Sequence, residues 1–362
     1  MAIPFGTPPA FMGYVGFVKL KAGEIQADPG STPTGALNYQ DYTFRALSAD
    51  INVKQEITKP DLIDSRYDRT AYQLGPKIID GSINFPVVYE VNSGNTKTLF
   101  EIMYRLAVTR KGDGLLSDFE LDVKYATTPN DLNTSGFTYK NCIINSFNFS
   151  VAQSDIVQCT VELIGRERVE KGFIASDDPA NLVCNSGADG GFGTTRIVTW
   201  NDARVELYTG SLSGDAVIGG QYIRTFDLTI ANDAERYYTL NGALFPQAIA
   251  PRKRDITGTI VLMGRHNQLG AAAFENQKHC NTDAEINFGY VTPNTGLECS
   301  STTFDTVLPN VIYEIETMAL TNDIFESTVA YHSLPAAGIN VCDPLLQKIG
   351  DATFTQNYEQ DN

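Results

Sequence analysis

The feature that most constrains this chain of 362 residues is an order of sequence patterns that occurs twice. Residues 44–51 alternate apolar and polar side chains after an arginine-containing start, and residues 223–230 do the same. Each segment is followed by an irregular loop with proline and then by a glycine-led strand pattern, at Gly81 and at Gly258. A repeat of this length predicts two copies of one supersecondary unit in a single chain.

The alternation predicts strands with one buried face, because successive side chains of a strand point to opposite sides. The residues expected to face a core are Leu47, Ala49 and Ile51 in the first copy, and Phe226, Leu228 and Ile230 in the second. First strands are expected earlier in each copy, at 11–21 and at 200–208.

A helix candidate and a closing hairpin follow in each copy. Residues 95–110 carry apolar side chains at helical spacing, and the shorter, Ala-rich segment 268–279 is the counterpart. The apolar stripe of the first helix comprises Leu99, Ile102, Met103 and Leu106. Hairpins are expected over 143–164 and 311–331, because both segments alternate around turn residues.

The repeat divides the chain into two domains, 1–168 and 198–350. Residues 169–197 include a glycine-rich run and are expected to be a linker, and the polar residues 351–362 are expected to be a loose tail. Abundant β-branched and aromatic residues favour strands. We therefore expect a mainly β (α+β) fold, with one helix beside the strands of each domain.

The acidic net charge of the chain limits the classes of partner that it is expected to bind. The formal net charge is −16 and the isoelectric point is about 4.6. Such a surface repels nucleic-acid phosphates and anionic membranes, although acidity most often serves solubility alone. The first residues lack a signal-peptide pattern, and no apolar run approaches the length of a membrane helix. We expect a protein that is assembled in a cytoplasm and has no membrane partner.

The six cysteines form no CxxC pair, which argues against zinc and redox motifs. Cys142 and Cys159 are expected on the two arms of one hairpin, about 20 Å apart at roughly 3.3 Å per residue, which is too far for a disulfide. Disulfides between subunits remain open for the others, Cys184, Cys280, Cys299 and Cys342.

Catalysis finds little support in the sequence. The chain has three histidines, and no nucleophile, metalloprotease or nucleotide-binding fingerprint is present. We expect no catalytic residue, no cofactor and no metal.

An ordered set of motifs resembles tail tube proteins of long-tailed bacteriophages. It comprises Ile57-Thr58-Lys59-Pro60-Asp61-Leu62-Ile63-Asp64, Gly75-Pro76, Gly81-Ser82-Ile83-Asn84-Phe85-Pro86 and a closing hairpin that ends at Gly165-Arg166. The resemblance covers most of residues 11–166, and a weaker resemblance covers residues 200–335. The second copy departs from the pattern, because it lacks the sequence found at residues 60–75 of the first copy.

The resemblance implies a structural virion protein. Each domain would be a small β-barrel or a sandwich of two sheets with a flanking helix, and sheets of neighbouring subunits would join around a channel for DNA ejection. Single-domain members form hexameric rings, so a tandem chain implies a trimer with pseudo-sixfold symmetry. The implied partners are other copies of the chain, tail-completion and baseplate proteins, the tape measure protein, a sheath, and double-stranded DNA that passes without specific binding.

Two groups of residues are candidates for function in such a tube. Polar residues opposite the apolar strand faces would line the channel: Ser48, Asp50, Asn52, Glu162, Asp227, Thr229, Glu314 and Glu316. Without the resemblance, the sequence favours an ordinary solvent-facing sheet face at these positions, and the resemblance favours the channel.

A charged loop would contact the next ring through Lys59, Asp61, Asp64, Arg66, Tyr67, Asp68 and Arg69. The alternative for this loop is a solvated surface segment.

Two other functions stay open for the whole protein. One is a baseplate hub with a tube fold, which copy number in the particle would distinguish from the major tube. The other is a β-sandwich adhesin, which exposed aromatic clusters would indicate.

Overall fold

The structure is a computed structural model in which strands predominate, so the expected mainly β fold is confirmed. It describes residues 14–22, 42–44, 46–58, 73–88, 98–108, 116–126, 135–172, 197–209, 222–240, 243–263, 284–290, 304–308, 311–321, 324–333, 346–349 and 352–355.

The elements of the first half are β1 (Tyr14–Ala22), β2 (Tyr42–Phe44), β3 (Ser48–Thr58), β4 (Gln73–Pro86), α1 (Leu99–Val108), β5 (Phe119–Ala126), β6 (Ser135–Ala152), β7 (Gln158–Gly165) and β8 (Glu167–Gly172). Those of the second half are β9 (Ala203–Thr209), β10 (Ile223–Ala231), β11 (Ala234–Tyr237), β12 (Ala248–Pro251), β13 (Asp255–Met263), β14 (Ala284–Tyr290), β15 (Phe304–Leu308), β16 (Val311–Thr321), β17 (Ile324–Ser333), β18 (Leu346–Ile349) and β19 (Ala352–Thr355).

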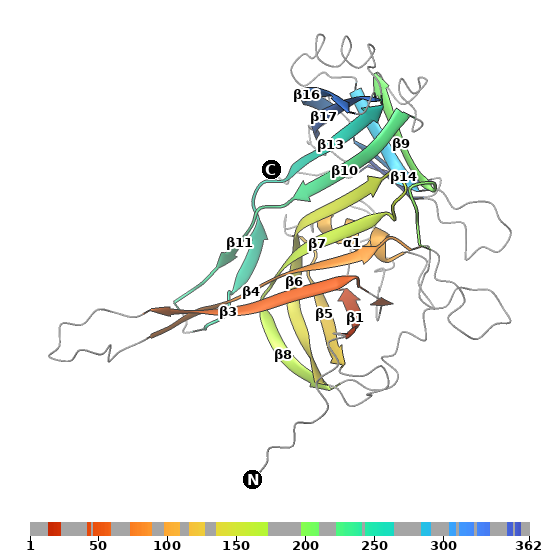
Figure 1. The fold of residues 1–362 in the computed structure, drawn as a ribbon. Coiled ribbons are helices and arrows are strands. Elements are labelled where there is room, and N and C mark those ends of the chain that lie inside the picture. The colour runs from red at the N-terminus through yellow and green to blue at the C-terminus, as the bar shows by residue number, and fades with distance from the viewer. Residues whose placement is uncertain are drawn as a thin grey trace, which may run out of the picture.

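A curved antiparallel sheet, here called the wall, runs through both halves (Figure 1). Its order is β3, β4, β7 and β6 from the first half, followed by β10, β13, β17 and β16 from the second. The pairing order is therefore the same in both halves, and β6 joins β10 where they meet. The repeat expected from the sequence appears in the wall as a repeated strand topology.

The remaining strands extend the repeat beyond the wall. The N-terminal part of the long strand β6 pairs with β5 and β8, and β5 continues to β1 and β2. In the second half, β15 pairs with β14 and β18 in the same way, and β14 pairs with β9. The pair β15 and β16 thus corresponds to β6.

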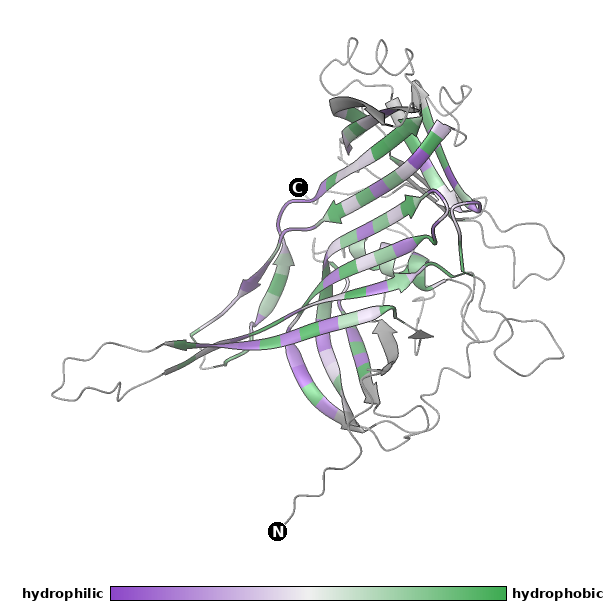
Figure 2. Ribbon diagram, viewed as in Figure 1, coloured by the Kyte–Doolittle hydropathy of each residue, from purple (hydrophilic) through white to green (hydrophobic). Residues whose placement is uncertain are grey.

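The core lies on the apolar face of the wall, around α1. Apolar and polar residues alternate along the wall strands (Figure 2). The Phe100 ring lies 5.7 Å from that of Phe147 in the first half and 4.8 Å from that of Phe304 in the second. All residues of α1 are buried, because sheets of both halves cover the helix, whereas the sequence predicts only a stripe. The halves therefore share one continuous core.

The register corrects one part of the sequence comparison. Leu47 is 53% exposed and immediately precedes β3. Gly81 pairs with Ile51, and Gly258 pairs with Leu228. Aligned on these glycines, Ala49, Ile51 and Val53 correspond to Phe226, Leu228 and Ile230, two residues away from the alignment that the sequence suggests.

The other expected elements can be compared directly. The helix over 95–110 and both hairpins are confirmed as α1, β6–β7 and β16–β17. The segment expected to be a linker begins within strand β8, and the expected loose tail contains β19. The second helix candidate lies outside the described residues.

Gly81 and Gly258 allow the wall strands to pack closely. A Cβ atom at Gly81 would lie 2.7 Å from the carbonyl oxygen of Asp50. One at Gly258 would overlap the carbonyl oxygen of Asp227 and the hydroxyl of Tyr331. Side chains larger than hydrogen cannot occupy either position without shifting backbone, which accounts for glycine at the same place in both halves.

Candidate functional site

The polar face of the wall brings together most of the residues that the sequence predicts to line a channel. One row of directly paired residues runs Ser48, Asn84, Thr160, Asn148, Thr229, Thr257 and His332 across successive strands. A neighbouring row runs Asp50, Ser82, Glu162, Ser146 and Ala231. Because paired residues share a sheet face, these side chains form one polar surface over both halves.

Hydrogen bonds within this surface join residues of one strand or of two neighbouring strands. The Asn148 side-chain amide donates to the Thr229 hydroxyl at 2.9 Å, across the β6–β10 pair. Thr259 donates to the Asp227 carboxylate, and Asn52 donates to Asp50 at 3.0 Å. The groups in these hydrogen bonds are amides, hydroxyls and carboxylates, and Lys54, on the same face of β3, is an exposed cation beside them.

The two remaining lumen candidates lie on β16. Glu314 falls at the register shift between Tyr313 and Ile315. Glu316 pairs with Val329, whose side chain is buried on the apolar face. The register therefore places Glu316 in a row with core residues, while its neighbour Ile315 pairs with Ala330.

The joint between the halves is the pairing of β6 with β10. On the apolar face it pairs Phe147 with Ile230, Phe149 with Leu228 and Val151 with Phe226. All are at most 9% exposed. Within the described strands, β3 and β16 each have a single pairing partner, so they are the two free edges of the wall.

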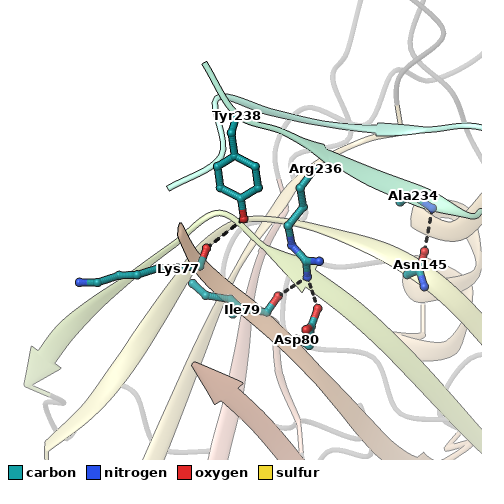
Figure 3. A network of polar contacts seen from close by, with 7 residues as sticks. All are labelled: Lys77, Ile79, Asp80, Asn145, Ala234, Arg236 and Tyr238. Carbon is teal, nitrogen blue, oxygen red and sulfur yellow. Dashed lines mark hydrogen bonds and ion pairs between the residues drawn. The ribbon is translucent and has the colours of Figure 1, made fainter. Parts of the chain in front are cut away.

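A second contact between the halves is made by the loop that leaves β10 and contains the β11–β12 hairpin (Figure 3). Arg236 forms an ion pair with Asp80 and donates to the Ile79 carbonyl oxygen at 3.0 Å, both on β4. The Tyr238 hydroxyl donates to the Lys77 carbonyl oxygen at 3.2 Å. Partial burial raises the pKa of Tyr238, whose hydroxyl is in any case protonated at neutral pH. We call this set of contacts the clamp.

The clamp begins at a β-bulge in β6. The side-chain oxygen of Asn145 accepts a hydrogen bond from the Ala234 backbone at 2.9 Å, and the Asn145 carbonyl accepts one from Asn232 at 2.7 Å. The Asn232 side-chain amide donates to the Ala107 carbonyl at 2.9 Å, and the Arg254 guanidinium donates to the Val108 carbonyl. Residues of the second half thereby satisfy carbonyl groups at the end of α1, where the helix has no partners of its own.

Sequence reasoning missed the joint and the clamp. Their signal is a run without charged residues, 237–251, in a chain with 19% charged residues. Arg236 immediately precedes this run, and Tyr238, within the run, makes a further clamp contact.

Other predicted features are placed as follows. The expected ring-stacking loop, from Lys59 to Arg69, lies outside the described residues. Cys142 and Cys159 are buried free thiols, and burial raises the pKa of both. The described residues hold no cluster of three side chains suited to a metal ion. They also include no helix with the length and hydrophobicity of a membrane crossing.

Comparison with known proteins identifies the family. The family described as phage tail tube protein matches residues 16–314, which include both halves of the wall. A search of curated proteins finds no match to the chain. Because the family match covers most of the sequence and the structure is mainly β, this chain belongs to the phage tail tube protein family.

Proposed function

We propose that this chain is the structural subunit of a phage tail tube, and that three copies close each ring with pseudo-sixfold symmetry. The observation that carries the proposal is the β6–β10 joint. It connects two copies of the same strand order within one chain and leaves β3 and β16 as free edges at opposite ends of the wall. Head-to-tail pairing of these edges closes a ring when the rotation between copies is a third of a turn.

The size of such a ring suits a channel. Each half contributes four wall strands, so three chains contribute 24. With strands about 4.8 Å apart and tilted by about 40°, the backbone diameter is roughly 48 Å. Barrels of about 16–18 strands already leave an aqueous channel, so this ring has ample space inside.

The polar face of the wall would line the channel, with Ser48, Asp50, Asn52, Glu162, Asp227 and Thr229 on it. Glu314 and Glu316 were candidates for the same role, and the β16 register favours Glu314 over Glu316. A polar to acidic lining repels phosphates and lets double-stranded DNA pass without specific binding. The apolar face and α1 would then lie outside the channel.

Rings would stack through the loops between the first and second wall strands of each half. In the first half this is the segment with Lys59, Asp61, Asp64, Arg66, Tyr67, Asp68 and Arg69. Its counterpart in the second half carries Tyr237 and Leu240, which are 46% and 109% exposed. Exposed apolar side chains on an uncharged loop support contact with another subunit.

The proposal places the protein in the virion tail after assembly in the host cytoplasm, without catalytic activity. Its partners would be its own copies, tail-completion and baseplate proteins, and the tape measure protein and sheath where the tail has them. Residues 1–168 and 198–350 would act as the two ring-forming domains.

The test is electron microscopy of the concentrated full chain, combined with native mass spectrometry of rings. We expect hollow tubes or stacked rings with three chains and six lobes per ring. Rings of six chains would overturn the trimer, and monomers at every concentration would overturn the proposed ring. A Leu240→Lys variant should form single rings that do not stack, whereas Asn201→Lys, at an exposed position outside this loop, adds the same charge and serves as the control.

A further inference from the structure

The two free edges of the wall have residue-level counterparts in the joint. Aligned on Gly81 and Gly258, β3 corresponds to β10, so that Ile51 occupies the position of Leu228. Following the pairing through β7 and β17, Leu163 corresponds to Tyr331, and their partners Ile144 and Tyr313 correspond in turn. Thus β16 corresponds to the C-terminal part of β6.

A shared irregularity supports this correspondence independently. The β6–β7 register shifts between Ile144 and Ser146, and the β16–β17 register shifts between Tyr313 and Ile315. Bulges re-aim a strand at a fixed position and are seldom coincidental. The bulge residues are Asn145, whose two oxygens accept hydrogen bonds from Ala234 and Asn232 of the clamp, and Glu314. The alignment on the two glycines and the position of the bulges therefore give the same correspondence between β16 and β6.

The joint thereby specifies how β16 of one copy would meet β3 of the next. Within the chain, Ser150 pairs with Asp227, Phe149 with Leu228 and Phe147 with Ile230. The corresponding pairs between copies are Ala319 with Asp50, Met318 with Ile51, and Glu316 with Val53. Each pair keeps the same face as its counterpart, so the polar surface and the apolar surface both continue into the next copy.

The apolar side of this second joint carries less hydrophobic material than the first. Phe149 and Phe226 of the joint within the chain correspond to Met318 and Ala49, and Phe147 corresponds to Glu316. Smaller apolar groups remove less area from water, and a carboxylate at the edge loses hydration when a strand covers it. The contact between copies is thus the weaker of two joints with one geometry.

Resting on the proposed ring, we infer that copies of this chain associate by antiparallel pairing of β16 with β3, in the register that places Ala319 opposite Asp50 and Met318 opposite Ile51. The partner is a second copy of the same chain, and the joint formed is a less apolar version of the β6–β10 joint.

Cysteine cross-linking tests this register in the full chain. The in-register variant carries Ala319→Cys and Asp50→Cys, at positions on the polar face. Directly opposed residues lie within disulfide reach, whereas diagonal residues are about 7–8 Å apart. The off-register control is Ala319→Cys with Ser48→Cys, and the two single variants report background from the native thiols. Ser150→Cys with Asp227→Cys reproduces the chemistry within one chain.

After oxidation of the concentrated protein, we expect denaturing gels without reductant to show species of two and three linked chains for the in-register variant. The off-register control should give at least about tenfold less of them, because its thiols are out of reach. Preferential linking of the off-register control overturns the register, even if rings of three chains are present by microscopy. Rings in which neither pair links overturn the edge pairing while the proposed function stands. Monomers at every concentration overturn both.

Discussion

The two ends of the wall differ in what they face, although their strands follow one plan. The C-terminal part of β6 presents Phe147, Phe149 and Val151 to β10, in a joint that is permanent because both partners belong to one chain. The corresponding positions of β16 are Glu316, Met318 and Leu320, at an edge without a pairing partner among the described strands. An edge that must stay soluble before assembly cannot carry the aromatic surface that suits a permanent joint.

The largest expected effect comes from removing an aromatic side chain of the permanent joint. The Phe149 ring lies 5.2 Å from Phe100 and 5.5 Å from Phe288, so it contacts both halves of the core. We expect Phe149→Ala to lower the free energy of unfolding by about 3–5 kcal/mol, through lost burial and a cavity. Chemical denaturation followed by circular dichroism measures this.

The matched variant is Met318→Ala, at the corresponding position of β16. We expect it to change monomer stability by less than half as much as Phe149→Ala, and to weaken ring formation instead. Equal losses of monomer stability in the two variants would show that the edge is as deeply packed as the joint, against the difference described above.

The second effect concerns the two close-packed glycines. Gly258→Ala should cost about 2–3 kcal/mol, because β13 is held between β10 and β17 and cannot move away from the added methyl group. Gly81→Ala should cost less in the monomer, because the edge strand β3 can shift. Thermal unfolding of both variants gives the comparison, and a larger loss for Gly81→Ala would contradict it.

The third effect would make the free edge resemble the joint. Glu316→Phe places an aromatic side chain where β6 has Phe147. We expect the concentration at which rings appear to fall about tenfold, corresponding to about 1.4 kcal/mol. Sedimentation velocity over a concentration series measures it. Thr317→Phe, on the opposite face, adds a similar ring and should not lower this concentration, so an equal decrease would indicate general stickiness.

The smallest effect concerns the clamp. Arg236→Ala removes the contacts to Asp80 and Ile79, and we expect a loss of about 1 kcal/mol, since the Asp80 side chain is 46% exposed. Asp80→Asn should cost less, because Arg236 keeps the Ile79 carbonyl. Hydrogen exchange of β4 and β11 amides should be faster in Arg236→Ala than in the parent chain. Unchanged exchange would mean that the hairpin is held by its backbone contacts alone.

The sequence was sufficient for features that repeat locally. Alternation located the wall strands, helical spacing located α1, and turn residues located both closing hairpins. Pairing between distant segments was not readable, because β6 and β10 each have an apolar face that fits many partners. The two-residue error at Leu47 arose for the same reason, since a period of two permits alignment by any even step. Arg236 and Asp80 are 156 positions apart, and only the fold brings them together.

The covalent connection behind the β6–β10 joint has a kinetic consequence. Two segments tied in one chain meet at an effective concentration in the millimolar range, whereas separate chains meet at their cellular concentration. Half of the six joints in a ring of three chains would therefore be complete before any two molecules collide. Because both halves belong to one chain, their sequences can differ. The ring therefore presents two different surfaces in alternation, and a partner with threefold symmetry can bind one of them.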